Sequence, residues 1–179
     1  MADHKKQPML IVFGGLSGTG KTTLAKAIAE ELAATYLRVD VIEQALRASG
    51  SLAGGVGAGG YVVAYALAES NLRLGGIVVA DSVNPLAITG NAWRQVAANA
   101  LSRIVEVEII CSDQVEHKRR VETRVCDIGG LPLTWKQVIE RDYEAWNEPR
   151  IVIDTANYSV VPHWPLCCDK FRSWIKALG

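Results

Sequence analysis

The stretch Gly15-Leu16-Ser17-Gly18-Thr19-Gly20-Lys21-Thr22 decides the fold of this chain. It matches every fixed position of the pattern G-x-x-x-x-G-K-[ST], in which a glycine-rich loop (the P-loop) binds phosphate groups. An apolar run of strand length, residues 9–13, precedes it, and apolar residues at helical spacing follow it in residues 24–32. Strand, glycine loop and helix are the context that the motif requires. The alternative, a glycine turn that only joins a strand to a helix, is much less favoured.

The loop predicts how this chain would bind ATP and Mg²⁺. Its glycines let backbone N–H groups turn toward the phosphates, and the helix that begins near Lys21 directs further N–H groups at the same anion. The Lys21 ammonium would contact the β- and γ-phosphates, and the Thr22 hydroxyl would be a ligand of Mg²⁺. Ser17 and Thr19 are assigned backbone contacts only. The predicted nucleotide-binding residues are Gly15, Ser17, Gly18, Thr19, Gly20, Lys21, Thr22 and Thr23.

Length and composition indicate one domain over residues 1–179, with 49% hydrophobic and 21% charged residues. Basic and acidic residues both number 19, and this balance makes nucleic acid an unlikely partner. No apolar run approaches the roughly 20 residues that cross a membrane. Four cysteines without a C-x-x-C spacing predict reduced thiols and a cytoplasmic protein.

Strand and helix patterns alternate along the chain. Strands are expected at residues 9–13, 35–40, 77–80, 105–111 and 150–154. Helices are expected at residues 23–32, 41–49, 61–74, 92–103, 113–124, 135–146 and 171–178. The glycine-rich segment 50–60 is predicted to be a loop. Five strands separated by helices predict an α/β fold, with a parallel sheet covered by helices on both faces.

Ligands bind at the carboxyl ends of the strands in such a sheet, so acids that end strands are informative. Asp40 could orient an acceptor hydroxyl and take its proton, or it could cap the helix that follows. Asp81 is expected to hold Mg²⁺ or substrate, the alternative being a turn residue before Pro85. Asp154 is interpreted as structural, with adenine contacts possible in residues 155–157.

Residues 117–124 are dense in cations. Asp113, His117, Arg120 and Arg124 share one helix face, whereas Arg119 is expected to point elsewhere. Together with the loop and helix that follow, this segment (residues 113–146) could form a helical lid whose arginines stabilise a transferring phosphoryl group. The alternative is a solvated face with ion pairs such as Glu116–Arg120.

Other polar residues are weaker candidates. Arg47 and Tyr61 could recognise the acceptor, because Arg47 shares a helix face with Asp40 and Tyr61 follows the glycine-rich segment. Tyr65 is more readily a core residue. His117 is interpreted as a helix-surface residue rather than a general base. The tryptophans are interpreted as packing residues whose N–H groups would need partners.

With these motifs in view, the chain resembles the small bacterial P-loop kinases described as AAA-family ATPases, which are related to chloramphenicol phosphotransferase, gluconate kinase and adenylylsulfate kinase. The matching segments are residues 14–23, 38–47, 79–85, 119–124 and 134–135, so the resemblance extends to about residue 155. It implies the three-layer P-loop fold with strand order 2-3-1-4-5, and ATP-dependent transfer to a hydroxyl group of a small molecule.

On matching positions, the resemblance implies a catalytic base at Asp40 and lid arginines at Arg120 and Arg124. The chain departs from the group at Ser17, where proline is frequent, and at Gly90, where an arginine is expected, so its acceptor or affinity would differ. The combined assignment is catalytic Lys21, Asp40, Arg120 and Arg124; substrate-binding Asp40, Arg47, Tyr61 and Asp81; and metal-binding Thr22 and Asp81.

Three functions therefore remain after the sequence alone. The favoured one is a small-molecule kinase that acts as a monomer or homodimer. A polynucleotide 5′-hydroxyl kinase would need a basic groove, which the zero net charge does not favour. An acceptor-independent ATPase or nucleotide switch is the third, and the absence of an N-K-x-D motif disfavours a GTPase.

Overall fold

The computed structural model describes residues 7–50, 55–125, 127–128 and 133–156. Five strands form one parallel sheet in the order β2-β3-β1-β4-β5, as the family resemblance implies. The strands are β1 (Met9–Gly14), β2 (Thr35–Arg38), β3 (Ile77–Asp81), β4 (Arg103–Ile110) and β5 (Ile151–Asp154). The helices are α1 (Lys21–Leu32), α2 (Val39–Ala48), α3 (Gly59–Arg73), α4 (Ala87–Asn99), α5 (Gln114–Thr123) and α6 (Trp135–Ile139).

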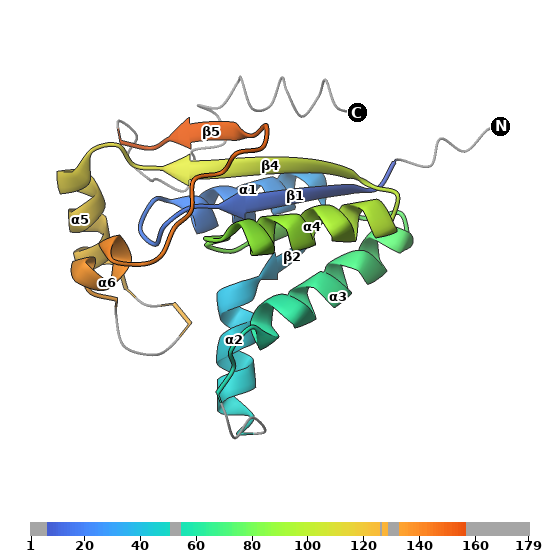
Figure 1. Cartoon of the computed structure of the whole chain (residues 1–179), viewed down its shortest axis with the longest axis horizontal. Helices are drawn as coiled ribbons and strands as arrows, with labels where there is room; N and C mark the ends of the chain where they lie inside the picture. Colours follow the sequence, from blue (N-terminus) through green and yellow to red (C-terminus); the bar gives the residue numbers. More distant parts are fainter. Residues whose placement is uncertain (1–6, 51–54, 126, 129–132, 157–179) are drawn as a thin grey trace.

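The central strand β1 explains why the fold has three layers. Successive side chains of a strand point to opposite faces of a sheet. Met9, Ile11 and Phe13 accordingly pack in the core on the α1 side, whereas Leu10 and Val12 pack in a second core with α3 and α4. Figure 1 shows α1 behind the sheet and α3 and α4 in front of it. Both faces of β1 are buried, as its unbroken apolar sequence predicts.

Helices α5 and α6 lie together at the end of the sheet where the parallel strands finish (Figure 1). Asp113 caps α5 by accepting hydrogen bonds from the N–H groups of Val115 and Glu116. Thr134 caps α6 in a capping box with Gln137. Both helices therefore begin at a side-chain cap. No helix in the described residues is long and apolar enough to span a membrane.

Several element boundaries differ from those expected. The helix expected at 92–103 runs instead from Ala87 to Asn99, and Arg103 already begins β4. The helix expected at 135–146 ends at Ile139. Helix α2 begins at Val39, two residues before the expected start, so the expected strand 35–40 is shorter than predicted. The helix expected at 171–178 lies outside the described residues.

Candidate functional site

The P-loop connects β1 to α1 in the conformation that its glycines permit. Gly15 has a φ angle of 135° and Gly18 one of 87°, values that side-chain-bearing residues rarely adopt. A Cβ atom on Gly15 would overlap the carbonyl oxygen of Ile109, and one on Gly18 would lie 2.6 Å from a methyl group of Val121. Backbone strain and lack of space therefore both require glycine at these two positions.

A cavity of about 830 Å³ opens between the P-loop, the start of α2 and helix α5. Most of the predicted site residues line it, namely Ser17, Gly18, Gly20, Lys21, Thr22, Thr23, Asp40, Arg120 and Arg124. It brings together the N-terminus of α1, the carboxylates of Asp40, Glu116 and Asp127, and several cations. This volume is within the range of small-ligand sites. The arrangement fits a nucleotide whose phosphates meet the P-loop and a second ligand near Asp40.

Behind the cavity lies a buried group of charges centred on Asp81. One carboxylate oxygen of Asp81 is 3.4 Å from the Lys21 ammonium, and the other accepts a 2.7 Å hydrogen bond from the Tyr36 hydroxyl. The Asp81 side chain is only 1% exposed. Burial acts to raise the pKa of Asp81, but Lys21, Tyr36 and Thr22 outweigh burial and lower it below its ordinary value. Asp81 is therefore an anion, and its carboxylate orients the Lys21 ammonium and the Thr22 hydroxyl.

Arg38 is the second buried cation of the site, after Lys21, and sequence reasoning did not single it out. Its guanidinium forms two hydrogen bonds with the carboxylate of Asp127, of 2.6 and 3.1 Å. It also lies 3.9 Å from carboxylate oxygens of both Asp40 and Asp81. The bonds from Arg38 lower the pKa of Asp127. Arginine at the end of a strand is a weak sequence signal, because its partner is 89 residues away.

Asp40 lies at the second residue of α2 rather than at the end of β2. The helix cap is Arg38, which makes no side-chain cap hydrogen bond, so the interpretation of Asp40 as the cap is wrong. An acid in the first turn still interacts favourably with the helix dipole. The Asp40 side chain is 40% exposed and lines the cavity, where it is accessible to a ligand.

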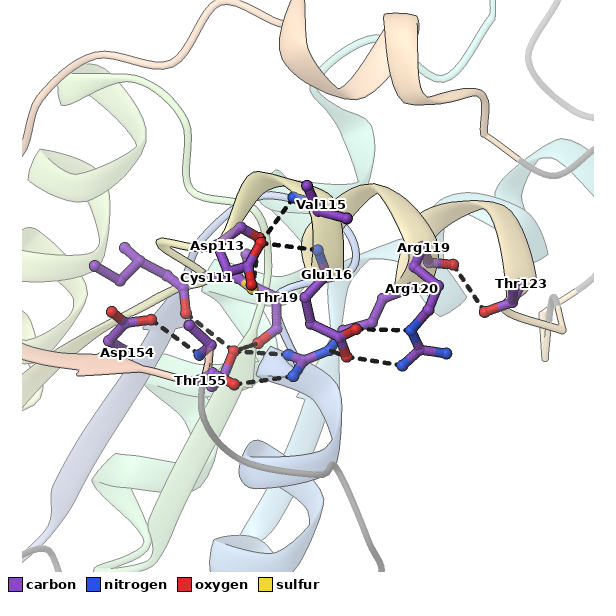
Figure 2. Close-up of polar contacts among 12 residues, drawn as sticks. Thr19, Cys111, Asp113, Val115, Glu116, Arg119, Arg120, Thr123, Asp154 and Thr155 are labelled. Carbon is purple, nitrogen blue, oxygen red and sulfur yellow. Dashed lines mark hydrogen bonds and ion pairs between the residues drawn. The ribbon is translucent and has the colours of Figure 1, made fainter.

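Helix α5 presents Arg119 and Arg120 to the cavity, and both are already paired. The Glu116 carboxylate accepts hydrogen bonds from both Arg119 and Arg120 (Figure 2), which lower the pKa of Glu116 to about 2. Arg120 also donates to the hydroxyl and carbonyl oxygens of Thr155. Arg119 lines the cavity with Arg120, so the expectation that it points elsewhere is wrong. Arg120 therefore satisfies both alternatives of the sequence analysis, because it pairs with Glu116 and also lines the cavity.

His117 is buried, so its interpretation as a helix-surface residue is wrong. Its Nε2 atom lies 2.8 Å from the carbonyl oxygen of Ser17 in the P-loop, and its ring packs edge-on against Trp135. Helical periodicity alone cannot reveal this burial, since the covering surface comes from the P-loop, 100 residues earlier.

Five predicted site residues do not line the cavity, namely Asp81, described above, and Arg47, Tyr61, Gly15 and Thr19. Arg47 pairs with Glu43 on an exposed part of α2, and the Tyr61 hydroxyl accepts a hydrogen bond from the N–H of Asn84. Gly15 donates its N–H to the Val83 carbonyl, and Thr19 is buried. These positions support the site from outside or belong to other surfaces.

The other sequence interpretations have separate outcomes. Trp93 is fully buried against Tyr65, which confirms both as packing residues, although the Trp93 N–H has no partner among the described residues. Asp154 accepts hydrogen bonds from backbone N–H groups of Ser112 and Ala156, as its structural interpretation predicts. Gly90 is buried in α4, next to Arg94.

This fold and site define a P-loop nucleoside-triphosphate-binding protein. A family described as AAA domain matches residues 10–129, and the chain belongs to this family. Over 185 aligned positions, it is 27% identical to an adenylyl-sulfate kinase of Synechococcus sp. (strain JA-2-3B'a(2-13)), and the alignment covers 97% of this chain and 98% of that protein.

Solved kinases share the fold. An APS kinase of Mycobacterium tuberculosis, solved with AMPPNP and APS, superimposes with a TM-score of 0.68 at 20% identity and covers 96% of this chain and 98% of its own. A gluconokinase of Sinorhizobium meliloti 1021 gives a TM-score of 0.63 at 17% identity and covers 97% of each chain. The chain therefore has the fold of small P-loop kinases.

Proposed function

We propose that this protein is an ATP-dependent kinase that transfers the γ-phosphoryl group to a hydroxyl group of a small molecule. One observation carries the proposal: a single cavity joins the phosphate-binding end of α1 to the accessible carboxylate of Asp40 and to the cations of α5. A phosphoryl transferase needs these three parts in one place, because its catalysis is mainly positioning and charge stabilisation.

The nucleotide half of the cavity consists of the P-loop, Lys21 and Thr22. The α1 N-terminus and the loop N–H groups bind phosphate oxygens, and Lys21 contributes a full positive charge. Thr22, with Asp81 behind it, would hold Mg²⁺, which supplies neutralisation of phosphate charge when bound. Since Asp81 does not line the cavity, it acts through the groups that it orients.

The acceptor half is assigned to Asp40. Its carboxylate orients the hydroxyl and takes its proton as the oxygen attacks the γ-phosphorus; one P–O bond forms, the β–γ bridging P–O bond breaks, and ADP leaves. Arg38 holds Asp40 from a buried position. Arg120 and Arg124, together with Arg119, line the same cavity, which supports a role for them in stabilising charge on the transferring group.

The acceptor is to be found by experiment. The similarity to an adenylyl-sulfate kinase and the shared fold with a gluconokinase suggest adenylyl sulfate and gluconate as the first compounds to test. We would add nucleosides, sugars and aminocyclitols, and measure phosphorylated product by mass spectrometry with γ-labelled ATP. ADP formed without any acceptor would instead favour an acceptor-independent ATPase.

The variant Asp40→Asn tests the assignment. It keeps the shape of the side chain but removes the proton acceptor, so transfer should fall by at least about a hundredfold while ADP affinity stays within about threefold. Asp142→Asn is the matched control, because Asp142 is exposed and does not line the cavity. Full transfer activity in Asp40→Asn would refute the role of this residue.

A further inference from the structure

Two carbonyl groups of the P-loop are held by side chains from other elements. The Ser17 carbonyl lies 2.8 Å from His117 Nε2, and the Thr19 carbonyl lies 2.8 Å from the Thr155 hydroxyl. A carbonyl oxygen can only accept, so His117 must carry its proton on Nε2. The His117 ring packs edge-on against the Trp135 ring, which fixes its orientation. The two ring centroids are 5.0 Å apart, and the angle between the ring planes is 81°.

The second contact continues to Arg120 (Figure 2). Arg120 donates to the Thr155 hydroxyl and to the Thr155 carbonyl, both at 2.9 Å. The hydroxyl has one proton to donate and two carbonyls within reach, Thr19 at 2.8 Å and Ile110 at 3.0 Å. The Ile110 carbonyl already accepts a hydrogen bond from the Thr155 N–H at 2.9 Å. We therefore assign the hydroxyl proton of Thr155 to the hydrogen bond with the Thr19 carbonyl.

These contacts fix two peptide planes of the loop. In a trans peptide, the C=O and N–H groups point in opposite directions, and the described part of the chain holds no cis peptide. When the Ser17 and Thr19 carbonyls point toward His117 and Thr155, the N–H groups of the next residues, Gly18 and Gly20, turn the other way. Gly18 and Gly20 both line the cavity, where backbone N–H groups of the loop can bind phosphate oxygens.

We propose that His117 and Thr155 are positioning residues that hold the P-loop in its phosphate-binding conformation, with Arg120 acting on the loop through Thr155. The inference rests on the nucleotide binding of the proposed function. It gives α5 a role besides delivering charge: its inner side sets the loop, whereas Arg119 and Arg124 face the cavity. Arg120 does both, since it lines the cavity and orients the Thr155 hydroxyl.

Matched substitutions test the two contacts separately. Thr155→Val removes the hydroxyl at constant shape, and Thr155→Ser keeps it. His117→Leu removes the donor, and His117→Gln places an amide N–H near the position of Nε2. The affinities for ADP and inorganic tripolyphosphate, measured by calorimetry, should fall about tenfold in Thr155→Val and His117→Leu, as expected for one misdirected charge-assisted hydrogen bond. Thr155→Ser and His117→Gln should stay within about threefold of the wild type.

All affinities are measured well below the unfolding temperature of each variant, so that every variant is folded. A general loss of stability would then leave the two variants of each pair with the same phosphate affinity. Equal ADP affinities for Thr155→Val and Thr155→Ser, or for His117→Leu and His117→Gln, would overturn the inference. Each pair is informative by itself if a variant of the other fails to fold. ADP binding needs no acceptor, so a wild-type chain that binds ADP but phosphorylates nothing would refute the proposed function and leave this inference standing.

Discussion

The replacement of Asp81 by asparagine should destabilise the protein strongly, because Asp81 is the anion of a buried charge group. Its carboxylate is 3.4 Å from the Lys21 ammonium and 3.9 Å from the Arg38 guanidinium, and all three side chains are less than a tenth exposed. Removing one partner of a buried pair leaves an uncompensated charge and costs about 3–5 kcal/mol. Asp142→Asn, at an exposed acid, should change the free energy of unfolding by no more than about 0.5 kcal/mol.

Urea denaturation at several pH values tests this reasoning. The pKa of Asp81 is lowered in the folded state, so its stabilisation is fully present above the unfolded value of about 3.9 and is lost as the pH falls through the folded value. The difference in unfolding free energy between wild type and Asp81→Asn should therefore be constant near neutral pH and narrow below about pH 3.9. A difference under about 1 kcal/mol at pH 7, or one that does not narrow in acid, would refute the buried-anion interpretation.

Three further predictions concern the P-loop and the α6 cap. Gly18→Ala should weaken ADP binding and lower the unfolding free energy by more than about 1 kcal/mol, since its Cβ would lie 2.6 Å from Val121; calorimetry and urea denaturation check this, and wild-type values would contradict it. Lys21→Met should reduce phosphoryl transfer at least about a hundredfold, measured with labelled ATP, and undiminished transfer would remove Lys21 from the mechanism. Thr134→Ala should cost about 1 kcal/mol, and Thr134→Ser, which keeps the cap to Gln137, should cost less in the same denaturation assay.

The sequence predicted the fold well where one local pattern determines the structure. The P-loop motif, the apolar run of β1 and the helical spacing of α1 each need only neighbouring residues. The boundaries expected for α4 were wrong, and its start was expected five residues too late. Glycine and proline, here Gly90 and Pro85, usually indicate a loop. The helix nevertheless includes Gly90, where an added Cβ atom would make only ordinary van der Waals contacts with Arg94 and Asn84.

The candidate site was predicted less completely, because its charges are paired between distant segments. Lys21, Thr22 and Asp40 line one cavity with the α5 arginines, as the motifs suggest. Arg38 and Asp127 are separated by 89 residues, and no local pattern links one to the other. Their pairing depends on how the fold brings the end of β2 next to the segment after α5. The periodicity of apolar residues cannot predict this arrangement.

Helix α5 shows why a charged helix face is ambiguous in sequence alone. A face counted by three- and four-residue steps groups His117, Arg120 and Arg124, yet these residues have different neighbours in the fold. His117 meets the P-loop and Arg120 meets Thr155, whereas Arg124 lies beyond the last helical residue, 4.0 Å from Asp127. Arg120, which donates to the Thr155 carbonyl, orders the structure even when no ligand is bound. Arg124 is more exposed than Arg120 and lines the cavity, where it can contact a phosphate group. Substitutions on α5 should therefore separate into those that change nucleotide affinity through the loop and those that change the rate of transfer.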